Sequence, residues 1–223
     1  MYVKAPAVPH GVTWGDWIEI AGVYVVLALY TSIAAMTLRS RGALASGAPV
    51  RSIFLLLTAT VSYVLGRGMH VASNAIHDMM GSGGGAELRD LVYFWDERAG
   101  HVLVDAARIL FVIGLCVLER GAGGAAGRAN GGWARLLVAL GAAAYGFNYF
   151  ATAIEGQTVI LALPFTVVLV AWSLLARRDA SRAHAFSPVR GFFWAAALIS
   201  LLLFLLYGVW QRGFPEFTRA GIL

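Results

Sequence analysis

The chain has 223 residues, of which 59% are apolar and only 13% are charged, a balance that excludes an ordinary soluble domain of this length. The net charge of +5 comes mostly from arginines between apolar stretches, with no aromatic residues interleaved, so attraction to anionic lipid explains it and nucleic acid is not expected as a partner. The single cysteine, Cys116, excludes a disulfide framework and a thiolate metal site.

Six apolar stretches are long enough to cross the hydrocarbon of a bilayer, which takes about 20 helical residues. The sequence predicts an all-α integral membrane protein, a bundle of six transmembrane helices that forms a single domain over residues 1–223. The predicted helices cover 16–37, 52–79, 90–118, 133–154, 157–176 and 190–211. The first stretch follows a segment with no basic region and no small-residue cleavage site, so we expect a retained helix rather than a signal peptide.

The second stretch ends in a polar stripe of His70, Asn74 and His77, at spacings of four and three residues. Ionisable groups at membrane depth are costly, so they are rarely present without a partner or a task. Seven residues of helix separate the two histidines by about 10 Å along the axis. We therefore expect His70 to bind a metal ion and His77 to act in proton transfer or at a second ion.

The third stretch carries Glu97 and His101 four residues apart, which places both side chains on one face of a helix. Asp105 continues this stripe one turn deeper. The second and third stretches are antiparallel and joined by a short turn, so His70 comes level with residues 98–101. We predict that His70, Glu97 and His101 hold one metal ion.

The ligand types narrow the choice of metal. An imidazole and a carboxylate one turn apart, facing a histidine on the next helix, is a spacing that helical metal sites use. Zinc accepts these ligands in tetrahedral sites, and non-haem iron uses two histidines and one carboxylate with open positions. We expect zinc, with iron as the alternative.

The fourth stretch ends in a further polar stripe of Asn148, Thr152 and Glu155. Metal-assisted hydrolysis usually requires a base near the metal-bound water. We predict that Glu155 or Asp96 is this base and that His77 is a further catalytic residue. Arginines inside apolar stretches could pair with the carboxylates or hold a lipid phosphate. The residues predicted to bind the substrate are Arg67, Asn74, Tyr93, Arg98 and Asn148.

The fifth and sixth stretches contribute no histidine. Glu155, Gly156 and Gln157 join the fourth stretch to the fifth, which leaves room only for a tight hairpin. Pro164 is the one interior proline that could break a helix at mid-membrane, as many transporter sites require.

Charge predicts the orientation. Ten of the 17 basic residues fall in three alternate loops, which the positive-inside rule makes cytoplasmic. They are Arg39, Arg41, Arg51, Arg120, Arg128, Arg135, Arg177, Arg178, Arg182 and Arg190. Of the 12 acids, only Glu119 and Asp179 fall on the inner side. We expect both termini to face outward, and the site to face the extracytoplasmic side of a bacterial inner membrane.

The pattern GRGMH at 66–70, followed by FWDE at 94–97, weakly resembles the ceramidase and adiponectin-receptor group of seven-helix zinc amidohydrolases. That group places a histidine late in an early helix and an acid in the next. It also takes two zinc ligands from an HxxxH motif in its last helix, whereas 190–211 here contains no histidine, and Gly66 stands where the group has serine. The resemblance covers some 30 residues and implies only that such an active site can exist in a helical bundle.

These observations predict a metal-dependent membrane hydrolase that acts on a lipid or other amphipathic substrate through a metal-activated water, or an oxidative iron enzyme with the same ligands. A transporter of protons or metal ions is an alternative, because chains of Asp, Glu and His inside a membrane also form proton relays. A second alternative is an electron carrier with haem between His70 and His101. A purely structural polar network would need fewer groups, since each interhelical hydrogen bond contributes only about 0.6 to 2 kcal/mol.

Overall fold

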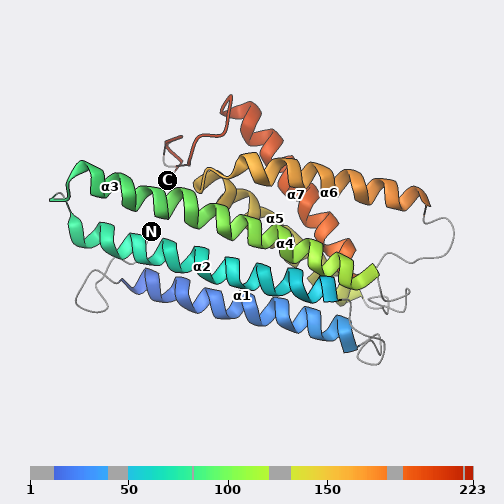
Figure 1. The fold of residues 1–223 in the computed structure, drawn as a ribbon. Coiled ribbons are helices and arrows are strands. Elements are labelled where there is room, and N and C mark those ends of the chain that lie inside the picture. Colours follow the sequence, from blue (N-terminus) through green and yellow to red (C-terminus); the bar gives the residue numbers. More distant parts are fainter. Residues whose placement is uncertain are drawn as a thin grey trace.

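The computed structural model describes residues 13–39, 50–81, 83–120, 132–179, 188–217 and 219–222. Nearly all of the regular secondary structure in these residues is helical. Most of these helices run side by side along one axis, and α7 crosses the others obliquely (Figure 1). The helices are α1 (Trp14–Arg39), α2 (Val50–Met80), α3 (Ala86–Tyr93), η2 (Phe94–Gly100, a π-helix), α4 (His101–Arg120), α5 (Gly132–Glu155), α6 (Val159–Asp179) and α7 (Pro188–Trp210).

Five helical segments of the described chain are long and apolar enough to span a membrane. They are Trp14–Leu38, Val50–Met80, Ala86–Glu119, Arg135–Glu155 and Val189–Trp210, with a shorter apolar segment at Val159–Leu175. Large apolar side chains such as Phe54, Leu137 and Leu206 are exposed on their outer faces, as expected of surfaces that meet lipid tails. The predicted all-α fold is confirmed, with several helices long and apolar enough to span a membrane; in the described residues five segments, rather than the predicted six, meet this requirement.

The predicted helix at 90–118 differs from the one observed. The helix begins earlier, at Ala86, and its second part is the π-helix η2 rather than an α-helix. The turn before it lies at one end of the bundle, where the chain passes from α2 to α3 (Figure 1). Three of the arginines used to predict orientation, Arg41, Arg128 and Arg182, lie outside the described residues.

A capping box fixes the start of α1. The backbone N–H of Thr13 donates to Asp16 Oδ2 at 2.7 Å, and the backbone N–H of Asp16 donates to Thr13 Oγ1 at 3.3 Å. Two N–H groups that have no partner inside the helix are thereby satisfied. Glu19 follows one turn later, at the same end of the bundle as the turn between α2 and α3.

Two glycines let α2 approach the end of η2 and the start of α4 closely. A Cβ atom at Gly66 would lie 2.7 Å from the backbone oxygen of Gly100, and one at Gly100 would lie 3.1 Å from the backbone oxygen of Gly66. Small residues at helix contacts are typical of membrane bundles, where packing replaces the hydrophobic effect as the main attraction. This contact places His70 and His101 at a similar level along the two helices, because His70 lies one turn after Gly66 and His101 directly follows Gly100.

The predicted hairpin between the fourth and fifth stretches is confirmed as a tight turn from α5 to α6. The backbone N–H of Gly156 still donates to Thr152, and Gln157 adopts a left-handed conformation with φ 51°. The chain after α7 folds back over this turn: the Gln157 side chain donates to the carbonyl of Phe214 at 3.4 Å. The turn between α5 and α6 therefore lies beneath the C-terminal segment.

Candidate metal centre

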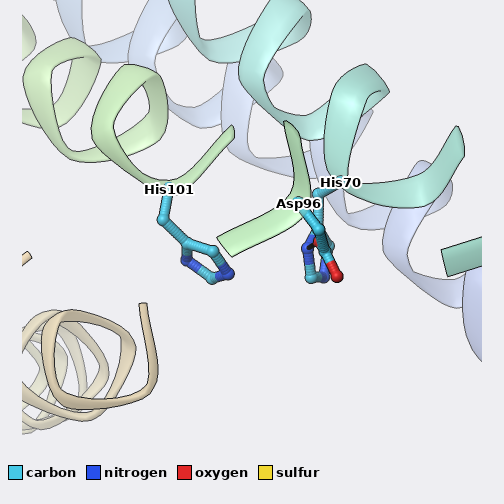
Figure 2. A group of neighbouring side chains, drawn as sticks. All are labelled: His70, Asp96 and His101. Atoms are coloured by element: carbon cyan, nitrogen blue, oxygen red, sulfur yellow. Dashed lines mark hydrogen bonds and ion pairs between the residues drawn. The ribbon is translucent and has the colours of Figure 1, made fainter. Parts of the chain in front are cut away.

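His70, Asp96 and His101 come together where α2 meets the π-helical segment and the start of α4 (Figure 2). One possible ligand atom from each residue lies within 4.8 Å of those of the other two. The imidazole rings of His70 and His101 meet edge to face with their centroids 5.0 Å apart. The structure thus brings together the two histidines that the sequence predicted to face each other.

The π-helix determines which acid faces His70. Backbone hydrogen bonds in a π-helix join residues five apart rather than four, so the faces of the helix shift relative to an α-helix. Asp96, five residues before His101, has its Oδ1 in contact with Nδ1 of His70. Glu97, the predicted metal ligand, lies beside this group with its Oε2 3.8 Å from Nε2 of His101. The structure therefore places Asp96, predicted as a base, in the position expected for Glu97.

Glu19 is a site residue that the sequence analysis did not select. Its Oε2 lies 3.4 Å from Nε2 of His70 and 3.2 Å from Nη2 of Arg67. Both ring nitrogens of His70 therefore face a carboxylate. The signal was present in the sequence, because Glu19 stands one turn inside an apolar stretch, where an ionisable group requires a partner.

Gly156 provides the surface on which His101 packs. A Cβ atom at Gly156 would lie 2.7 Å from Cβ of His101 and closer still to the imidazole ring. Real Cβ atoms do not make contacts this short, so a larger residue would displace the ring. The turn between α5 and α6 thus holds His101 from the side opposite α2.

Two of the predicted substrate-binding residues touch this group. The amide nitrogen of Asn74 lies 3.3 Å from Nε2 of His70, and Arg67 is paired with Glu19. Tyr93 and Arg98, also predicted to bind the substrate, are exposed on the surface of α3 and η2.

Two predicted catalytic residues lie outside the group. His77 is exposed, with Nδ1 3.6 Å from Oδ1 of Asp78, and the structure does not bring it to the other histidines. Glu155 accepts a hydrogen bond at 3.1 Å from the backbone N–H of Phe217.

Asp105 and Arg108 form a separate, deeper network. Asp105 is almost fully buried, 3.2 Å from Nη1 of Arg108, and it accepts a hydrogen bond from the hydroxyl of Thr158. Arg108 also donates to Thr152 and, at 3.3 Å, to Oδ1 of Asn148, the remaining predicted substrate residue. This network joins α4 to α5 and to the start of α6, because buried charges need such partners.

Comparison of the chain with known protein families, with curated proteins and with solved structures finds no match. Two imidazoles and one carboxylate are a ligand set that both catalytic zinc and non-haem iron use, in each case with open coordination positions.

Proposed function

We propose that His70, Asp96 and His101 hold a divalent metal ion, zinc or alternatively iron, and that the protein is a membrane hydrolase acting on a lipid or other amphipathic substrate. The observation that supports this proposal is the convergence of three ligand atoms within 4.8 Å of one another. Three protein ligands leave a position open for water or substrate, as in catalytic zinc sites. When bound, the metal supplies the positive charge that makes water a nucleophile near neutral pH.

Glu97 is the carboxylate best placed to act as the base. Its Oε2 lies 3.8 Å from Nε2 of His101, and its side chain is partly open to the surroundings. Glu155, one of the two bases that the sequence predicts, instead accepts a hydrogen bond from the backbone of Phe217. Glu97 would take the proton from the attacking water and return it to the leaving group, which is the usual work of a general acid–base residue.

Depth in the membrane supports an amphipathic substrate. His101 lies 18 residues before Glu119 in one helical span, a separation of roughly 27 Å at 1.5 Å per residue. This is close to the thickness of the hydrocarbon, about 30 Å. Glu119 pairs with Arg190 at 3.3 Å at the far end of the bundle. The candidate site would therefore lie near one headgroup region, where the scissile bond of a lipid is found.

We also propose that Val159–Leu175 is a sixth span, because about 25 Å of helix is within the range that crosses a bilayer. Six crossings leave both termini on one side, together with the site. The positive-inside rule then places the site outside, in a bacterial inner membrane. On a Cys116→Ala background, Glu87→Cys should react with an impermeant maleimide in spheroplasts, and Arg135→Cys only after permeabilisation. The reverse labelling pattern would contradict this orientation.

The alternative of a proton or metal-ion transporter is favoured by one observation. Glu19, His70 and Asp96 form a carboxylate–imidazole–carboxylate chain that joins α1, α2 and η2. Such chains occur in proton relays. The haem alternative is less favoured, because the rings of His70 and His101 are in direct contact and a porphyrin would have to lie between them.

An activity assay tests the hydrolase directly. Purified protein loaded with zinc should hydrolyse a fluorogenic lipid amide or ester, lose this activity to a chelator and regain it with added zinc. Glu97→Gln should lower kcat by about 100-fold to 10,000-fold, the usual contribution of a general base, while the metal stays bound. Glu87→Gln, an exposed acid on α3, is the matched control. Zinc-loaded protein that hydrolyses none of these substrates would contradict the proposal.

A further inference from the structure

The two nitrogens of His70 have different surroundings. Nδ1 contacts Asp96, and Nε2 lies 3.4 Å from Oε2 of Glu19. An imidazole that binds a metal through one nitrogen carries its proton on the other, and that N–H needs an acceptor. Carboxylates fill this role at many metal sites, where they fix both the tautomer and the orientation of the ring.

We infer that Glu19 is a positioning residue of the metal centre: it accepts a hydrogen bond from Nε2 of His70 and so leaves the lone pair of Nδ1, the nitrogen that faces Asp96, to bind the metal. This inference rests on the proposed function. Arg67 supports it, since its Nη2 lies 3.2 Å from the same carboxylate oxygen. The guanidinium balances the charge of Glu19 and holds it beside Nε2 rather than among the ligands.

The location of Glu19 gives α1 a role in the site. Only a small part of α1 is buried within the bundle, and it packs mainly on α2 and α4. Tyr30 stacks on Phe111 of α4 with ring centroids 4.0 Å apart, which anchors α1 in its middle. At its beginning, the ion pairs of Glu19 with Arg67 and His70 connect it to α2. The docking of α1 and the orientation of His70 are therefore coupled.

Asn74 is a second neighbour of Nε2 of His70. Its amide group lies 3.3 Å from Nε2 of His70, and an amide can present either its oxygen or its nitrogen. The amide oxygen would accept from the same N–H. A carboxylate is the stronger acceptor, because hydrogen bonds to charged groups are roughly twice as strong as neutral ones. Glu19 is therefore expected to have the larger effect.

Titration of the purified protein with Co²⁺, followed by visible absorption, tests this role. We expect Glu19→Gln to weaken Co²⁺ binding by about 10-fold to 100-fold, the usual effect of losing such a carboxylate. Glu19→Asp should recover part of the affinity. Arg67→Gln, which leaves the carboxylate but removes its anchor, should show a smaller loss in the same direction. The control Glu87→Gln removes the same charge from an exposed position and should bind like the wild type.

The outcomes separate this inference from the proposed function. If the wild type and Glu19→Gln bind Co²⁺ equally well, the role of Glu19 is overturned and the metal centre is not. A Co²⁺ spectrum of Glu19→Gln that shows one ligand fewer also overturns it, because Glu19 would then be a ligand. Folded wild type that binds no Co²⁺ overturns the metal centre itself. If Glu19→Gln does not fold, Arg67→Gln and Glu19→Asp give the same comparison.

Discussion

The position of His101 depends on the absence of a side chain at Gly156. The ring of His101 occupies the space that a Cβ atom at this position would need. On its other side, His101 meets the ring of His70. The imidazole is thus held between a turn and a neighbouring helix, and its orientation is fixed by packing.

Gly156→Ala should therefore displace His101 and weaken metal binding at least 10-fold. Overpacking of this kind also destabilises proteins by about 1–3 kcal/mol. Isothermal titration with Zn²⁺ and thermal unfolding in detergent measure the two effects. Gly68→Ala is the control, because a Cβ there meets nothing within 4 Å and alanine favours the helix. Unchanged zinc affinity in Gly156→Ala would show that His101 does not need this surface.

The sequence predicts the site residues only in part. His70 and His101 could be matched because residues equally distant from a turn lie at equal depth. The choice of Glu97 over Asp96 assumed α-helical periodicity, which η2 interrupts. Glu19 could not be assigned to the site because the sequence does not state which helices are neighbours.

Among the elements, η2 has the largest consequence for the candidate site. Its seven residues include Asp96 and Glu97, two of the three acids that face His70 or His101, and π-helical turns within α-helices are frequent at functional sites. The segment FWDERAG carries no proline, and its one glycine, Gly100, stands at its last position, so the sequence does not mark a π-helix. Its conformation depends on how the neighbouring helices pack, and so periodicity alone could not reveal it. The apolar lengths of the surrounding stretches, by contrast, were sufficient to predict an all-helical chain with several helices long enough to span a membrane.

Deletion of Arg98 tests the role of the π-helix. This residue is exposed, so its removal should let the segment revert to α-helix with little loss of packing. Asp96 would then turn away from His70 by roughly 100°, the rotation per residue of a helix with 3.6 residues per turn. We expect metal binding to fall at least 10-fold while the protein still inserts and folds. Deletion of Gly83 in the preceding turn is the control, and equal metal affinity in both deletions would contradict this account.

In the whole molecule, the polar groups lie at different levels along the helices. The candidate metal centre lies where Glu19 near the start of α1 and Gly156 just after α5 meet His70 and His101, the network of Asp105 and Arg108 lies one to two turns further along α4, and Glu119 pairs with Arg190 at the far end of α4. Each buried charge of the deeper network has partners on other elements, as stability in a low-dielectric interior requires. In the candidate metal centre, by contrast, the side chains of Glu97 and His101 keep part of their surface exposed.

Metal content is the most direct test of the central claim. Detergent-purified wild type, Asp96→Asn, Glu97→Gln and His101→Ala would be compared by plasma mass spectrometry, with folding checked by circular dichroism. The account predicts one zinc or iron per chain in the wild type and in Glu97→Gln, and loss of the metal in Asp96→Asn and His101→Ala. Folded wild-type protein without stoichiometric metal would contradict the metal centre and favour a proton-handling role for the same residues.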